Sequence, residues 1–188
     1  IALQYAGNGH HTGIRKLRAS GVGKRLPKGA QDPERELAVS GVYRVNGKGQ
    51  VTLLVSDLTF PNGIAFSPNE KTLYVAVSDP KKPVIIAYDV EMDGTVTNGR
   101  DFFDAAQLAA SGGKGLPDGL KVDKLGNVWS TGPGGVLIVT PEGKHIGTLS
   151  TGEPTANCAF GGPKGTTLYI TANMYLCRVQ TLVKGAGF

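Results

Sequence analysis

Short runs in which apolar and polar residues alternate make up most of the chain, and glycine, asparagine, aspartate or proline separates one run from the next. A period of two over about four to eight residues is typical of half-buried β-strands joined by tight turns. The pattern therefore predicts an all-β protein with one short helical turn at residues 105–111. Strands are expected at residues 41–45, 51–55, 63–66, 72–77, 84–90, 101–104, 120–122, 128–130, 136–140, 145–149, 158–160, 168–171 and 176–181.

The alternating runs belong to a larger repeat. Residues 60–78 (FPNGIAFSPNEKTLYVAVS) and 115–135 (GLPDGLKVDKLGNVWSTGPGG) both contain proline, then asparagine or aspartate, then glycine, followed by a strand, a polar turn and a second strand. A third copy, altered at its start, is TANCAFGGPKGTTLYITANM at residues 155–174. Repeats of about 40 to 55 residues with four short strands each are typical of β-propeller blades. We count about three and a half blades: two strands of one, two complete blades, and three strands of another.

The candidate chemistry lies in two equivalent motifs, the PNG motif (Pro61-Asn62-Gly63) and the PDG motif (Pro117-Asp118-Gly119). Each begins the innermost strand of a blade, beside the central channel of a propeller, where oxygen ligands from different blades can converge on one metal ion. With no histidine or thiolate nearby, Asn62 and Asp118 favour Ca²⁺, Mg²⁺ or Mn²⁺ over a dedicated zinc site. Asn-Gly and Asp-Gly are also ordinary turn dipeptides, so a purely structural role stays open at this point.

Charge is unevenly distributed along the chain. The net charge is +5, yet residues 1–30 alone hold six basic side chains and no acidic one, so the remainder is close to neutral. We therefore expect residues 1–30 to be a basic, poorly patterned segment and residues 31–188 to be the partial propeller. The basic segment has little aromatic interleaving, so we expect no nucleic-acid partner. His10 and His11 point apart on a strand, so we interpret them as a solvated pair.

Several other function classes lack their signatures. The sequence has no run of 18 apolar residues, so no membrane span is predicted. No signal-peptide pattern follows Ile1, so such a segment was either removed or belongs to a longer chain. We expect a cytoplasmic protein, with a protein whose signal peptide was removed as the alternative. The sequence has no G-x-S-x-G, H-E-x-x-H or P-loop motif. Residues 132–135 fit a turn, Trp129 fits the core of a blade, and Cys158 fits a small buried apolar position.

Five motifs in order resemble the gluconolactonase family, which also includes senescence marker protein (regucalcin). They are LPKGAQDPERELAVSGVYRV, FPNGIAFSPNEKTLYVA, GLPDGLKVDKLGNVWSTGPGGVLIVTPEGK, TANCAFGG and TLYITANMYLCRV, and together they cover about residues 26–181. The resemblance implies a six-bladed propeller that hydrolyses a sugar lactone with one divalent ion in its channel. It also implies that Asn62 binds the metal and that Asp118 binds the metal and acts as the base.

Calcium is the first expectation for the ion, with Mg²⁺, Mn²⁺ or Zn²⁺ as alternatives. Two features of the family have no counterpart in this chain: a metal-binding glutamate of the first blade and a pocket asparagine that precedes the position of Leu26. Two other functions stay open. One is a non-catalytic propeller fragment whose exposed blade edges associate as a homodimer. The other is a related propeller esterase that acts on aryl esters or organophosphates.

Overall fold

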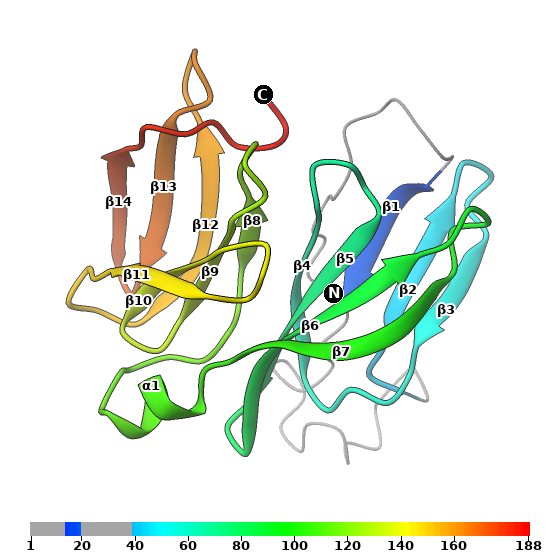
Figure 1. Ribbon diagram of the computed structural model, residues 1–188, viewed down its shortest axis with the longest axis horizontal. Coiled ribbons are helices and arrows are strands. Elements are labelled where there is room, and N and C mark those ends of the chain that lie inside the picture. The colour runs from blue at the N-terminus through cyan, green and yellow to red at the C-terminus, as the bar shows by residue number, and fades with distance from the viewer. Residues whose placement is uncertain (1–13, 20–38) are drawn as a thin grey trace.

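The computed structural model describes residues 14–19 and 39–188 (Figure 1). Within them the chain forms fourteen strands and one helix, α1 (Ala106–Ala110). The strands are β1 (Ile14–Ala19), β2 (Val42–Asn46), β3 (Val51–Val55), β4 (Pro61–Phe66), β5 (Thr72–Asp79), β6 (Lys82–Val90), β7 (Val96–Asp104), β8 (Leu120–Val122), β9 (Val128–Gly132), β10 (Gly135–Val139), β11 (His145–Leu149), β12 (Thr155–Gly161), β13 (Thr167–Ala172) and β14 (Tyr175–Gln180).

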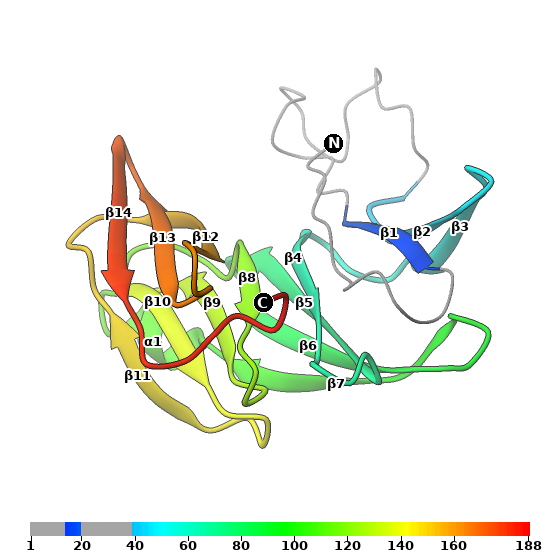
Figure 2. The ribbon, with the colours of Figure 1, turned by 90° about the horizontal axis from the view of Figure 1, so that it is seen from above.

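The strands form four antiparallel sheets, each built from consecutive segments of the chain. Their orders are β1-β2-β3, β4-β5-β6-β7, β8-β9-β10-β11 and β12-β13-β14. Figure 2 shows the four sheets following one another in chain order. This arrangement of short meanders confirms the all-β propeller architecture, with each sheet as one blade.

The core lies between successive sheets, and each strand divides its side chains between two neighbours. In β5, Val75 packs toward the first sheet, whereas Tyr74 and Ala76 pack toward the third. A third cluster, which includes Trp129 and Cys158, joins the third and fourth sheets. Because both faces of the middle sheets are covered, their central strands are buried along nearly their whole length. Trp129 and Cys158 are both buried, which confirms their predicted place in the core.

The expected strands and the helical turn are all present, and most of their bounds agree within three residues. Two differences are larger. Strand β7 begins at Val96, earlier than the expected residue 101. The apolar pattern missed its first half because those residues are mostly exposed and do not alternate between apolar and polar. The first sheet has a third strand, since β1 pairs with β2 inside the segment for which the pattern indicated no regular strand. The rest of residues 1–30, including His10 and His11, lies outside the described residues, and the boundary at residue 30 stays a prediction.

α1 has five residues, and among the described residues no helix is both long and apolar enough to cross a membrane.

Candidate metal centre at the start of the inner strands

The PNG motif forms a β-bulge within strand β4. Pro61 pairs with Val77 and Ile64 pairs with Val75, so Asn62 and Gly63 together lie opposite a single residue of β5. A bulge re-aims the side chain of the extra residue, and bulges are frequent beside functional sites. Asn62 and Gly63 therefore lie within a strand and do not form an Asn-Gly turn, while the choice between a structural and a metal-binding role is left to experiment.

The PDG motif repeats this geometry at the start of β8. The backbone N–H of Asp118 donates to the carbonyl of Thr131 (3.1 Å), and the N–H of Thr131 donates to the carbonyl of Gly119 (2.8 Å). Asp118 and Gly119 therefore both lie opposite Thr131, as in the bulge of the PNG motif. The third copy has a register shift between Thr155 and Asn157, so all three repeats carry an irregularity at the same place.

The glycines of both motifs are required by close packing. Neither Gly63 nor Gly119 has a positive φ, so backbone conformation does not demand glycine at either position. A Cβ on Gly63 would collide with the carbonyl oxygen of Asp118, and a Cβ on Gly119 would collide with the side chain of Asn157. The PNG motif of one blade and the PDG motif of the next are thus in direct contact.

Ser78, at the end of β5, links the two motifs by hydrogen bonds. The Asn62 side-chain nitrogen donates to Ser78 Oγ (3.0 Å), and Ser78 Oγ donates to the carbonyl of Pro117 (2.6 Å). Sequence reasoning missed Ser78, because its partner in the PDG motif lies 39 residues away along the chain.

The next residue, Asp79, is buried and ties down the segment that leads into the PNG motif. Thr59 Oγ1 donates to one carboxylate oxygen (2.6 Å), and the N–H of Lys81 donates to the other (2.8 Å). The hydrogen bond from Thr59, followed by that from Lys81, holds the pKa of Asp79 below its usual value. Asp79 therefore remains ionised and uses both oxygens within the protein.

The donor set suits a hard cation. Asn62 and Asp118 are both half-buried, and together they offer one amide and one carboxylate in adjacent blades. Among residues 39–188 no three histidine, cysteine, aspartate or glutamate side chains gather in a way that could hold a metal ion. Ca²⁺ accepts about six to eight oxygen ligands, including amide oxygens and water, so these two residues fit as part of its coordination sphere.

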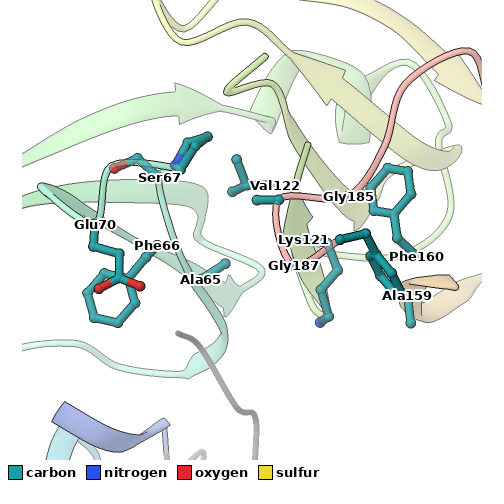
Figure 3. A pocket seen from close by; sticks show the side chains of 13 residues that line it. Ala65, Phe66, Ser67, Glu70, Lys121, Val122, Ala159, Phe160, Gly185 and Gly187 are labelled. Atoms are coloured by element: carbon teal, nitrogen blue, oxygen red, sulfur yellow. The ribbon is translucent and has the colours of Figure 1, made fainter. Parts of the chain in front are cut away.

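A cavity of about 310 Å³ lies at the opposite end of the inner strands (Figure 3). Its walls include Ala65, Lys121, Ala159 and Phe188, and neither Asn62 nor Asp118 lines it. Burial lowers the pKa of Lys121, and its ammonium group donates to the adjacent carbonyl of Leu120 (2.8 Å). The cavity is therefore separate from the candidate metal centre.

Comparison with known proteins decides the family. The family described as the SMP-30/gluconolactonase/LRE-like region matches residues 22–174. The chain belongs to this family. It is 38% identical over 160 residues to the gluconolactonase of Zymomonas mobilis, a match that covers 80% of the chain and 43% of that protein. The chain thus spans less than half the length of this relative.

Solved structures of the family have the same fold. A gluconolactonase from Xanthomonas campestris superposes with a TM-score of 0.70 at 32% identity, covering 83% of this chain and 49% of that one. A calcium-binding protein, regucalcin, from Agrobacterium tumefaciens superposes with a TM-score of 0.62 at 26% identity, covering 79% and 54%. The family resemblance is confirmed, while the metal-binding roles of Asn62 and Asp118 stay predictions.

Proposed function

We propose that the protein hydrolyses a sugar lactone with the help of a divalent metal ion, most readily Ca²⁺, held in part by Asn62 and Asp118. The observation that carries this proposal is the pair of matched bulges, which set an amide and a carboxylate at equivalent points of two blades in contact. The relatives named gluconolactonase support the substrate class. The relative named as a calcium-binding protein supports the ion.

The chain's own residues would divide the work. The Asn62 oxygen and the Asp118 carboxylate would hold the cation, and a cation bound there would polarise a lactone carbonyl and stabilise the negative charge that develops on its oxygen. Asp118 also accepts a proton from the attacking water, as a carboxylate within hydrogen-bond reach of that water can.

Lactone hydrolysis measured by acid release tests the proposal directly. The full chain is assayed with glucono-1,5-lactone before and after EDTA treatment, and again after Ca²⁺ is restored. We expect activity that EDTA abolishes and Ca²⁺ restores, and a loss of at least about 100-fold in Asp118→Asn. Asp101→Asn is the matched control, because Asp101 is an exposed aspartate of β7. Turnover of an aryl ester without lactone turnover would favour the propeller-esterase alternative instead.

A second candidate function, association of two copies of this chain, is favoured by the outer edge of the last sheet. Strand β14 is the edge of a three-stranded sheet, and Met174, Tyr175 and Leu176 at its start are 81%, 56% and 73% exposed. An edge strand with exposed apolar side chains is a template for pairing with another strand. Sedimentation of the chain and of Leu176→Lys tests this idea: a dimer that the substitution dissociates supports it, and a monomer at all concentrations rejects it.

A further inference from the structure

We propose that Ser78 is a positioning residue of the candidate metal centre. Its hydroxyl fixes which atom of the Asn62 amide faces the centre, and it ties that orientation to the backbone of the PDG motif. This inference rests on the proposed metal-dependent function and deepens it.

The argument begins with the single hydrogen of the Ser78 hydroxyl. That hydrogen is used by the bond to the carbonyl of Pro117, whose Oγ–O distance is 2.6 Å. Toward Asn62 the hydroxyl can then offer only a lone pair. The group that faces the hydroxyl must therefore be an N–H donor, and the Asn62 side-chain nitrogen donates to Ser78 Oγ at 3.0 Å.

The opposite orientation of the amide is disfavoured. If the Asn62 oxygen faced Ser78 Oγ, two acceptors would meet with no hydrogen between them, unless Ser78 gave up its bond to Pro117. In the part of the chain that the structure describes, Ser78 is the one side-chain hydrogen-bond partner of Asn62. The nitrogen is therefore held at Ser78, and the oxygen, which is the atom a cation requires, is directed away from it.

Ser78 is itself held in place independently of its hydroxyl. Its backbone N–H donates to the carbonyl of Phe60 (2.9 Å), and the adjacent Asp79 is fixed by Thr59 and Lys81. The side chain is half-buried at the end of β5. Residues that orient metal ligands commonly change metal affinity by about 10- to 100-fold when they are removed.

Calcium titration by calorimetry on the full chain tests this role. Ser78→Ala should weaken Ca²⁺ binding by about 10- to 100-fold, and Ser78→Thr, which keeps the hydroxyl, should restore binding to within about three-fold of the original. Ser67→Ala is the matched control. Ser67 Oγ also makes local hydrogen bonds in the same sheet, to Asn69 and from the N–H of Thr72, but at the far end of β4, so Ca²⁺ affinity should stay unchanged.

A double-mutant cycle with Asn62→Asp separates orientation from general structural support. A carboxylate presents oxygen in either orientation, so Ser78→Ala should cost almost no Ca²⁺ affinity in the Asn62→Asp background. An equal loss in both backgrounds would overturn the orienting role, as would unchanged affinity in Ser78→Ala alone. If the unaltered chain binds no Ca²⁺, the proposed metal centre itself is rejected, and the role of Ser78 with it.

Discussion

The two ends of strand β8 each carry an aspartate, and the two side chains have different surroundings. Asp123 follows the strand, is 0% exposed, and accepts four hydrogen bonds. They come from the N–H groups of Leu125 and Asn127, the side-chain nitrogen of Asn127, and the indole N–H of Trp129, all at 2.8 to 2.9 Å. Asp118 precedes the strand, is half-buried, and lies at the contact between two motifs.

The C-terminal segment covers the end of β8 that carries Asp123. The N–H of Lys124 donates to the carbonyl of Lys184, and the N–H of Ala186 donates to the carbonyl of Val122, both at 2.8 Å. The end of the inner strands that carries Asp123 and is covered by the C-terminal segment is called the closed end. The end that carries the PNG and PDG motifs is called the motif end. A carboxylate offers about four acceptor positions, and Asp123 uses them for three donors of its own turn and for Trp129 of β9. These hydrogen bonds stabilise the blade, whereas the motif end carries the two residues proposed as cation ligands, Asn62 and Asp118.

The largest effect is expected at the closed end. Asp123→Ala leaves four donors without their acceptor, three of them from the turn itself, and each unsatisfied buried donor costs about 1 to 3 kcal/mol. We expect a loss of about 4 kcal/mol or more in the free energy of unfolding, measured by urea denaturation. Asp123→Asn keeps one acceptor oxygen and should lose roughly half as much. A loss below about 1 kcal/mol for Asp123→Ala would contradict the structural role.

At the motif end, Gly63→Ala should destabilise the protein by overpacking. The added methyl group meets the backbone of Asp118, which cannot move without disturbing the PDG bulge, so a cost of about 2 to 3 kcal/mol is expected in urea denaturation. Gly147→Ala is the matched control, because a Cβ there has nothing within 4 Å and should change stability little. Equal effects of the two substitutions would mean that the motifs do not pack as described.

Between the two ends, the Cys158 thiol should make stability depend on alkaline pH. Burial raises its pKa from 9.0 to about 11, so the folded state keeps its proton while the unfolded state ionises. Stability is therefore unaffected below about pH 9 and falls as the pH rises toward 11, by about 2 to 3 kcal/mol. Cys158→Ala should remove this slope and Cys177→Ala should not. Burial also raises the pKa of Tyr88, to about 12, and its slope is common to both variants.

The smallest effect concerns Asp79, beside the motif end. Its pKa is lowered chiefly by Thr59, so the stability it contributes is present above the unfolded pKa, near 3.8, and is lost as the pH falls through the lower folded value. Thr59→Val removes that hydrogen bond at a cost of about 1 kcal/mol at neutral pH. When the free energy of unfolding is measured as the pH falls below 4, the Thr59→Val variant should lose less of it than the unaltered protein does. Superimposable pH dependence in the two proteins would contradict the assignment.

Much of the fold could be predicted from the sequence because its signals are local. Alternating apolar positions identified the strands, and the repeated motifs placed Asn62 and Asp118 at equivalent points. The turn around Asp123 also had a local signal, since its partners Asn127 and Trp129 follow within six residues. An aspartate ahead of a Gly-Asn turn is a common way to satisfy backbone donors.

The remaining features depend on contacts between distant segments. In the sequence, Gly63 and Gly119 cannot be told apart from glycines of ordinary turns. Only the packing of neighbouring blades shows that glycine is needed there for close approach. Ser78 has no pattern of its own, because its role comes from Asn62 in its own blade and Pro117 in the next. Strand β1 was likewise missed because its pairing with β2, not its alternation, defines it.

Calorimetric titration of Ca²⁺ into the full chain, with Asp118→Ala and Asn62→Ala beside it, tests the central claim most directly. The account predicts saturable binding at one site that is lost in Asp118→Ala and weakened less in Asn62→Ala, because only the former removes charge as well as an oxygen. Asp101→Ala, an exposed control on β7, should bind as the unaltered chain does. Absence of binding, or equal and mild effects of the two motif substitutions, would contradict a metal centre at the motif end.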